Sequence, residues 1–470
     1  MPSSSTTSST LTLALQRTLD SRARRKILRS LPSPSSPAPT SHPIDFTSND
    51  YLSLTTSPTL HTHVLRTLQH SPHILGSGGS RLLVNPHTHD SFERRVERVF
   101  NVSPTTEGRS VILFNSGYDA NVSFFSTVPQ PGDTVVYDEL IHASVHDGMR
   151  AGCRAERRVS FGHNDVEDLR GVLRRQQEGM GGTVFVAVES LYSMDGTFAP
   201  LREFVDVLEE EMVSRGGDGY LVVDEAHATG VYGPKGRGRV ALEGLEGHPR
   251  VLARLCTFGK ALGGSGALLI STPLITKYLL NYARPLVYTT ALSNMVVIAA
   301  GCSFDLLEDG TAEELAKKVL STSKSFTHTL RRRLRGEGVG RDIIRVGVGV
   351  GVRRRLREGT TQLRSDHTDL DAPTEREWRN VFTRTRLVVS SPQQVQHSRA
   401  SDNVADGAQG RRQSQGVFTR WSHEGTSRKV NRRDCRMGSG QGGTRRGRRR
   451  NTQSKGRRAY KYEHGRLGQK

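Results

Sequence analysis

Two apolar segments that each end in polar residues limit most strongly what this chain can fold into. Residues 220–223 have the length and composition of a buried strand, and the polar turn 224–230 follows them directly. Residues 251–256 form a second strand-like segment, which ends at residues 257–260 and a glycine-rich loop. In open α/β sheets, ligands bind at the carboxyl ends of the strands. The two segments therefore predict an α/β protein whose ligand site lies where these strands end.

Three side chains at these strand ends suggest a cofactor site. Taken singly, Asp224 is explained by a helix cap, His227 by a surface or core position, and Lys260 by an ordinary loop. Together they match what pyridoxal phosphate (PLP) requires of a protein. The cofactor needs a lysine for a Schiff base, a carboxylate for its pyridinium nitrogen and hydrogen-bond donors for its phosphate. The combination therefore predicts a PLP enzyme.

The sequences of both polar segments resemble those of a known family. Asp-Glu-Ala-His-Ala-Thr-Gly at residues 224–230 and Thr-Phe-Gly-Lys-Ala at residues 257–261 are similar to motifs of the α-oxoamine synthases. These enzymes are a PLP-dependent branch of the fold-type I aminotransferase superfamily. The resemblance implies an α/β fold with a mainly parallel central sheet covered by helices. It implies that Lys260 forms the Schiff base and that Asp224 contacts the pyridinium nitrogen. His227 would donate to the ring 3-hydroxyl, and Thr257 would complete this part of the cofactor site.

A phosphate site is expected at the start of the helix that follows another strand. Residues 111–114 have the composition of a buried strand and lead into Asn-Ser-Gly-Tyr-Asp-Ala-Asn at residues 115–121. A strand that enters a helix through Ser-Gly presents free backbone N–H groups, and the helix dipole favours an anion there. We therefore expect Ser116, Gly117 and Tyr118 to hold the cofactor phosphate. A plain strand-to-helix turn is the alternative, and the resemblance favours the phosphate site.

Further site residues follow only from the resemblance. It implies that His142 of a His-Ala-Ser motif lies over the cofactor ring, with a helix-start residue as the alternative. It also implies that Ser193 lies near the cofactor. Thr289 and Thr290 would reach the phosphate of the partner subunit, which implies a homodimer with shared active sites. The catalytic residues expected are Lys260, His142, Asp224 and His227.

Two residues are candidates for substrate binding. Residues 11–31 have a loose helical pattern, and in the family an arginine of this helix binds the substrate carboxylate; its spacing points to Arg29. A solvated basic helix is the alternative. Residues 44–54 match the family's opening motif, which implies that Asn49 faces the site. The Gly-Ser-Gly-Gly-Ser loop at residues 76–80 favours the oxononanoate-synthase branch over glycine-using relatives.

The resemblance implies a PLP-dependent acyltransferase. The reaction expected is the decarboxylative condensation of L-alanine with pimeloyl-CoA, a step of biotin biosynthesis. A relative that condenses glycine or serine with another acyl-CoA is one alternative, and an inactive truncated homologue is another. An amino acid and an acyl-CoA are the partners expected of an active enzyme.

The positive charge of the chain is concentrated in its C-terminal part. Of the net charge of +20, residues 346–470 contribute +18, with 29 lysines and arginines against 11 acidic residues. This part contains few apolar residues, so we expect it to be disordered rather than to pack a core. It also lacks a recognisable nucleic-acid-binding module and interleaved aromatic residues, so nucleic-acid binding is not expected. The resemblance stops near residue 345, which suggests that a wrong reading frame or a retained intron produced the tail.

The chain before the tail divides into three parts. We expect an N-terminal helix with a Pro/Ser linker over residues 1–45 and a large PLP-binding domain over residues 46–300. Residues 301–345 would form an interdomain helix and the start of a small domain, which is therefore incomplete.

Composition indicates the surroundings in which the protein works. The four cysteines have no metal-ligand spacing, so we expect a reduced compartment and no metal site. Apolar runs are too short to span a membrane. A cytoplasmic location is expected, with an organelle such as the peroxisome as the alternative. His163 is expected to mark a structural turn without chemistry.

Overall fold

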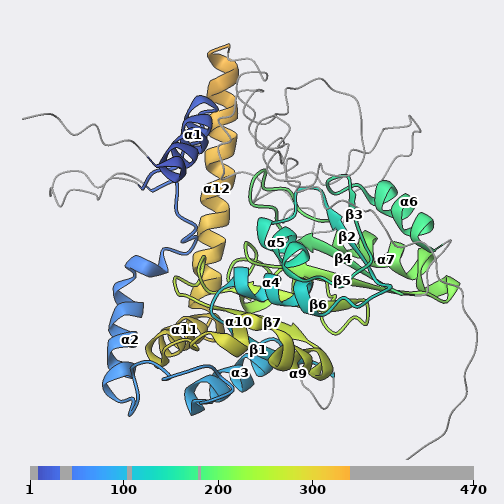
Figure 1. The fold of residues 1–470 in the computed structure, drawn as a ribbon. Helices are drawn as coiled ribbons and strands as arrows, with labels where there is room; N and C mark the ends of the chain where they lie inside the picture. Colours follow the sequence, from blue (N-terminus) through green and yellow to red (C-terminus); the bar gives the residue numbers. More distant parts are fainter. Residues whose placement is uncertain (1–8, 32–44, 103–107, 178–181, 339–470) are drawn as a thin grey trace, which may run out of the picture. The chain divides into compact units, whose positions relative to one another are not determined.

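The computed structural model describes residues 9–31, 45–102, 108–177 and 182–338. Its central element is a seven-stranded sheet with the order β1-β7-β6-β5-β4-β2-β3 (Figure 1). Strand β7 runs antiparallel to both of its neighbours, whereas all other neighbouring strands are parallel. This confirms the mainly parallel sheet expected from the sequence. The strands are β1 (Ser110–Phe114), β2 (Thr134–Asp138), β3 (Arg157–Phe161), β4 (Thr183–Glu189), β5 (Asp218–Asp224), β6 (Val251–Thr257) and β7 (Ala267–Ser271).

Alternate residues of the central strands pack into two separate cores, so the sheet is covered on both faces. In β4, Phe185 and Ala187 belong to one core, whereas Val186 and Val188 belong to the other. Burial on both faces explains why these strands are almost continuous runs of apolar residues. Helices α4 (Gly117–Thr127), α5 (Ala143–Ala151) and α9 (Pro273–Tyr282) supply the first core, and α6 (Val166–Gln177) and α7 (Leu201–Glu211) supply the second.

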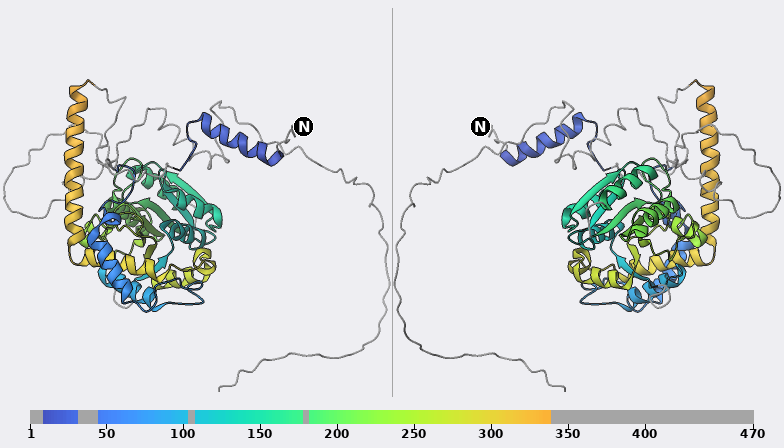
Figure 2. Two further views of the ribbon diagram at one scale, coloured as in Figure 1. Left: turned by 90° about the vertical axis from the view of Figure 1, so that its left-hand side faces the viewer. Right: turned by 90° about the vertical axis from the view of Figure 1, so that its right-hand side faces the viewer.

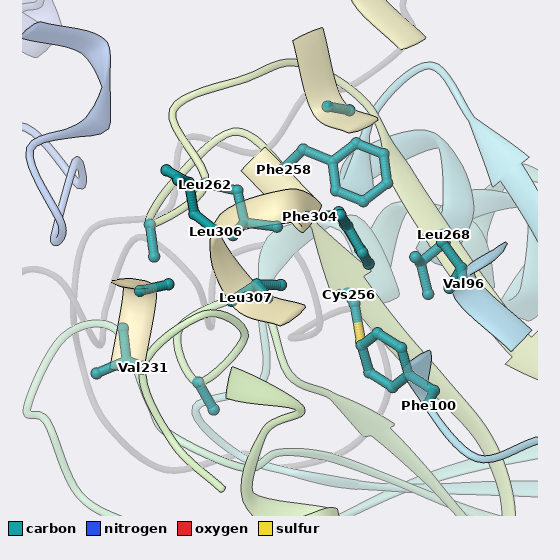
Figure 3. Close-up of a cluster of buried hydrophobic side chains, with 14 of the residues drawn as sticks. Val96, Phe100, Val231, Cys256, Phe258, Leu262, Leu268, Phe304, Leu306 and Leu307 are labelled. Atoms are coloured by element: carbon teal, nitrogen blue, oxygen red, sulfur yellow. The ribbon is translucent and has the colours of Figure 1, made fainter. Parts of the chain in front are cut away.

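A third core lies beneath the loop that carries Lys260. The rings of Phe92, Phe258 and Phe304 pack edge to face, with centroids 5.1 to 5.9 Å apart. Figure 3 shows Phe258 and Phe304 within this cluster. Since Phe258 directly follows the last residue of β6, these contacts fix the start of the Lys260 loop. The helices around this core are α2 (Pro58–Gln69), α3 (His87–Val99), α11 (Asn294–Glu308) and α12 (Thr311–Gly336).

The N-terminal helix is shorter than the sequence pattern predicted. Helix α1 (Thr10–Arg24) ends before Lys26, whose φ of 57° lies in the left-handed region. The Lys26 N–H donates to the Ala23 carbonyl and the Ile27 N–H to the Arg22 carbonyl, which is the bonding pattern of a Schellman cap. Arg29 therefore lies beyond the helix rather than on it, and its side chain is exposed. The expectation of a helix through residue 31 is wrong.

Helix α12 forms a single run of 26 residues (Figure 2). Its buried residues Ala312, Ala316 and Leu320 recur every fourth position and make one packed stripe. The division into domains stays a prediction, and the predicted tail, residues 346–470, lies outside the described residues. Shorter elements are α8 (Arg239–Leu242), α10 (Arg284–Tyr288), η1 (Leu54–Thr56), η2 (Val213–Arg215) and η3 (Pro234–Gly236).

The helices were also compared with what a membrane span requires. None of those within the described ranges is long and apolar enough to cross a bilayer.

Candidate active site

The ends of β4, β5 and β6 bring polar residues to one edge of the sheet. Asp224 is the last residue of β5, and Thr257 is the last residue of β6. Glu189 ends β4 and pairs in register with Asp224. These three side chains are buried, whereas Lys260, three residues beyond Thr257, is half-buried. The structure thus places Asp224 and Lys260 at neighbouring strand ends, where the sequence predicted them.

Both carboxylate oxygens of Asp224 accept hydrogen bonds. Oδ1 accepts from the backbone N–H of Ala226 at 2.9 Å, and Oδ2 accepts from Nδ2 of Asn121 at 2.8 Å. Asn121 lies on α4 and is itself 4% exposed. Two donors hold the carboxylate in one orientation, as a group that must face a ring nitrogen requires. Sequence reasoning assigned no role to Asn121, although it ends the motif at residues 115–121.

His227 is held by a tyrosine from a distant part of the chain. The imidazole is buried, and its Nδ1 lies 2.6 Å from the hydroxyl of Tyr51. The same hydroxyl lies 3.3 Å from Oδ1 of Asn49, the predicted substrate contact. The structure therefore brings the segment around Asn49 to the turn that follows β5. Tyr51 was missed because no periodicity or spacing links it to His227, 176 residues away.

His142 begins helix α5, as the alternative interpretation of its motif proposed. Its Nδ1 accepts a hydrogen bond from the backbone N–H of Ser144 at 3.2 Å and lies 2.8 Å from the Ser144 hydroxyl. Ser144 Oγ in turn accepts from Asn121 Nδ2 at 2.9 Å. The imidazole is exposed, so capping the helix leaves one of its faces accessible to a ligand. Its place over a cofactor ring stays a prediction.

The loop that carries Lys260 is closed by its own hydrogen bonds. Thr257 Oγ1 donates to the Gly266 carbonyl at 3.2 Å and accepts from the Gly259 N–H at 3.3 Å. The N–H of Gly263 donates to the Lys260 carbonyl at 2.9 Å. Together with the packing of Phe258, these bonds set where the lysine leaves the backbone.

The electrostatics of this edge place Lys260 near two acids. Burial, followed by the negative charge of Asp224, raises the pKa of Glu189 well above its usual value. The positive charge of Lys260 acts in the opposite direction on the same group, so the ammonium lies within electrostatic reach of Glu189. The backbone N–H of Ser193, the predicted cofactor neighbour, also donates to Glu189.

The start of α4 has the features of an anion site. Ser116 caps the helix, and its Oγ accepts from the Asp119 N–H at 3.0 Å. The first N–H groups, those of Gly117 and Tyr118, have no partner within a helix and point out of its end. A Cβ on Gly117 would lie 3.5 Å from Cβ of Thr257, so this helix end adjoins the end of β6. The hydroxyl of Tyr118 donates to Asp147 of α5.

Thr289 and Thr290 lie next to this predicted phosphate site. Asn115 Nδ2 donates to Oγ1 of Thr289 at 3.3 Å and to the carbonyl of Thr290 at 2.9 Å. Both threonines are exposed. Their predicted contact with the phosphate of a partner subunit needs a second chain and stays a prediction. Arg29 is different, since the contacts of the described residues do not connect it to this edge of the sheet.

His163 forms a link between two parts of the chain. Its Nδ1 lies 2.9 Å from Oδ1 of Asp138 at the end of β2, and its Nε2 lies 3.1 Å from Oδ2 of Asp195. Burial alone would lower the pKa of His163, but the two carboxylates outweigh burial and raise it to about 9. The imidazolium therefore ties β2 to the segment that follows β4.

The residues present fit PLP. An oriented, buried carboxylate suits the pyridinium nitrogen, and a buried imidazole held by a tyrosine suits the ring oxygen. A capped helix start beside the lysine loop suits the phosphate. Each class of donor or acceptor that the cofactor needs is supplied by a residue at this edge of the sheet.

Comparisons with known proteins show which family the chain is similar to. A family model described as aminotransferase class I and II matches residues 41–344. An 8-amino-7-oxononanoate synthase of Emericella nidulans is 45% identical over 315 residues, which cover 65% of this chain and 72% of that protein. The aminoacyl transferase sphA of Aspergillus fumigatus is 37% identical over 295 residues, which cover 61% of this chain and 60% of that protein.

A solved structure extends the similarity to three dimensions. A serine palmitoyltransferase of S. paucimobilis with bound PLP and myriocin is 29% identical, with a TM-score of 0.54, over 65% of this chain and 68% of that chain. The matches thus span between 60% and 72% of the lengths of these relatives.

Proposed function

Because the chain belongs to the aminotransferase class I and II family and is a PLP-dependent acyltransferase of the α-oxoamine synthase type, we propose that it condenses L-alanine with pimeloyl-CoA. The product would be 8-amino-7-oxononanoate, formed with release of CoA and carbon dioxide. The observation that carries this proposal is the position of Asp224 and Lys260 at adjacent strand ends, in a chain similar to a named synthase of this reaction.

The protein holds the cofactor through several of its own groups. Bound PLP supplies an electron sink for the negative charge that develops on the α-carbon of the amino acid. Asp224 keeps a negative charge against the ring nitrogen, oriented by its two hydrogen-bond donors. His227 binds the ring oxygen, with Tyr51 fixing the direction of the imidazole. The N–H groups of Gly117 and Tyr118 bind the phosphate.

Lys260 carries the proton transfer. Its Nζ would hold the cofactor, and as a neutral amine it would take the proton from the α-carbon of the amino acid. The hydrogen bonds of Thr257 and the packing of Phe258 hold the loop that carries Lys260, and this keeps Nζ in one position at the site. His142 would cover the face of the ring and exclude water from it.

Substrate recognition and assembly form a second part of the proposal. Asn49 is the supported candidate for a substrate contact, since its Oδ1 lies 3.3 Å from the hydroxyl that also binds His227. Arg29 remains a candidate, and it can contact the substrate only if the segment that follows α1 lies against the site. We also propose a homodimer in which Thr289 and Thr290 of one subunit bind the phosphate of the other.

A second candidate function is the condensation of glycine or serine with another acyl-CoA. It is favoured by the similarity to a serine palmitoyltransferase and to an aminoacyl transferase. The two candidates share the cofactor chemistry and differ in the amino-acid side chain and the acyl chain. A homologue without activity is the third possibility.

The experiment measures CoA release by the purified full chain with every pairing of L-alanine, glycine or L-serine with pimeloyl-CoA or palmitoyl-CoA. We expect release only with L-alanine and pimeloyl-CoA, together with a product of the mass of 8-amino-7-oxononanoate. Lys260→Ala should abolish release, whereas Lys277→Ala, at an exposed lysine of α9, should not. Release with serine and palmitoyl-CoA instead would establish the second candidate. Absence of release in every pairing, both from the full chain and from a chain whose residues after 345 are replaced by the small domain of an α-oxoamine synthase, would contradict both.

A further inference from the structure

The side-chain amide of Asn121 joins two residues that are assigned to the cofactor. Its Nδ2 lies 2.8 Å from Asp224 Oδ2 and 2.9 Å from Ser144 Oγ. A primary amide nitrogen has two hydrogens, so one group can donate to both acceptors. Asn121 is 4% exposed and Ser144 is fully buried, so water does not compete for these bonds.

The hydrogen bond from Asn121 to Ser144 determines which atom donates in the bond between Ser144 and His142. Because Ser144 Oγ accepts from Asn121, its single hydrogen is available for His142 Nδ1, which lies 2.8 Å away. The backbone N–H of Ser144 also donates to Nδ1. Two donors on Nδ1 require that nitrogen to be the acceptor, and the ring hydrogen then resides on Nε2.

The packing of α4 against α5 makes this connection possible. A Cβ on Gly148 of α5 would lie 3.0 Å from Cβ of Phe125 and 3.1 Å from the carbonyl oxygen of Asn121. A Cβ at this position would require the neighbouring atoms to move by a few tenths of an ångström, so glycine favours this close approach of the two helices. The close approach brings Asn121 on one helix within hydrogen-bond distance of Ser144 on the other.

We propose that Asn121 is a positioning residue that sets the orientation of Asp224 and, through Ser144, the tautomer of His142. The proposal rests on the cofactor roles of Asp224 and His142 given above. Asn121 itself touches neither the cofactor nor the substrate in this account. Its amide connects Asp224 to His142 by hydrogen bonds, so a change in the orientation of one side chain affects the other.

The tautomer of His142 can be read without cofactor, from the ¹⁵N resonances of labelled histidine in the full chain. The resonances of His142 are identified by their loss in His142→Gln. We expect hydrogen on Nε2 in the wild type, and a smaller excess of this tautomer in Ser144→Ala and in Asn121→Ala, where the backbone N–H of residue 144 still donates to Nδ1. Ser123→Ala is the matched control, since Ser123 is a fully buried residue of the same helix whose hydroxyl has no partner among the described residues.

The effect on Asp224 is read from the cofactor. Asn121→Ala should weaken PLP binding by about tenfold, the loss expected when a hydrogen bond to a charged group is removed. It should also shift the ¹⁵N resonance of labelled PLP toward the unprotonated ring nitrogen. Ser144→Ala should leave this resonance unchanged, because it breaks only the branch toward His142.

The outcomes separate this inference from the proposed function. If Asn121→Ala matches Ser123→Ala in the tautomer of His142 and in the ring-nitrogen resonance, the inference is wrong even though PLP binds. Hydrogen on Nδ1 of His142 in the wild type would overturn it equally. If borohydride reduction attaches no PLP to Lys260 of the wild type, the proposed function fails instead, and the tautomer measurement still decides the role of Asn121.

Discussion

Glu189 and Asp224 end the neighbouring strands β4 and β5 directly opposite each other, so two buried carboxyl groups share one edge of the sheet. When one of two such neighbouring carboxyl groups is charged, its charge disfavours ionisation of the other. Burial first, and the charge of Asp224 second, raise the pKa of Glu189 well above its usual value. Burial and the neighbouring carboxylate therefore favour the protonated form of Glu189.

This pairing predicts how Glu189→Gln changes stability. Because the pKa of Glu189 is raised in the folded state, its side chain stabilises the fold fully at pH values below its unfolded-state pKa of about 4.5. This contribution to the free energy of unfolding is lost as the pH rises toward the folded-state pKa. Glutamine does not titrate, so the variant should gain stability relative to the wild type as the pH is raised above 4.5. Urea unfolding at a series of pH values measures this difference. Parallel pH profiles for the two proteins would refute it, and Glu167→Gln, at an exposed site, is the control.

Asp224→Asn tests the charge itself. The amide keeps the shape of the side chain and removes its negative charge, so a bound cofactor should remain while turnover falls by orders of magnitude. The turnover number and the cofactor content of the purified variant are the measurements. Asp206→Asn, at an exposed position of α7, should behave like the wild type. Turnover near the wild-type value in Asp224→Asn would show that this carboxylate does not hold the ring nitrogen.

His163 predicts a separate dependence of stability on pH. Because Asp138 and Asp195 outweigh burial and raise its pKa to about 9, its contribution is complete below pH 6.5 and is lost as the pH rises through 9. The full contribution of His163 to the free energy of unfolding is on the order of 3 kcal/mol. His163→Gln should therefore be less stable than the wild type at pH 6 and approach it at pH 10, as measured by thermal unfolding. The exposed His61→Gln is the control, and an equal deficit at both pH values would disprove the ion pair.

Much of the sheet and the outline of the site could be predicted from the sequence. Strands β1 and β6 match the predicted segments 111–114 and 251–256 to within one residue, because apolar runs bounded by polar turns leave few other structures open. Asp224 and Lys260 were found because parallel strands end at a common edge.

Other features depend on contacts that have no local signal. Asn121 meets Ser144 where Gly148 favours the close approach of two helices, and Tyr51 meets His227 across 176 residues. The end of α1 was misplaced because Lys26, rather than a glycine, takes the left-handed conformation there. Helix-end signals in sequence rest mainly on glycine and asparagine, so a lysine at this position escapes them.

The C-terminal tail gives a prediction about the whole chain. If residues 346–470 do not form a small domain, as the sequence predicts, apolar surface of the large domain stays exposed to water, and this costs about 25 cal/mol per Å². We expect low activity or aggregation of the full chain, and recovery when the residues after 345 are replaced by the small domain of an α-oxoamine synthase. CoA release from pimeloyl-CoA and L-alanine is compared between the two proteins. Equal activity would show that residues 346–470 are a functional extension.

The covalent attachment of PLP to Lys260 is the central claim, and borohydride reduction followed by peptide mass mapping tests it most directly. Reduction makes the bond between the lysine and the cofactor permanent, so the modified peptide can be identified after proteolysis. We predict that the peptide containing Lys260 gains the mass of reduced PLP and that Lys260→Ala eliminates the modified peptide. A modified peptide around another lysine, or none in protein incubated with PLP, would contradict this account of the site.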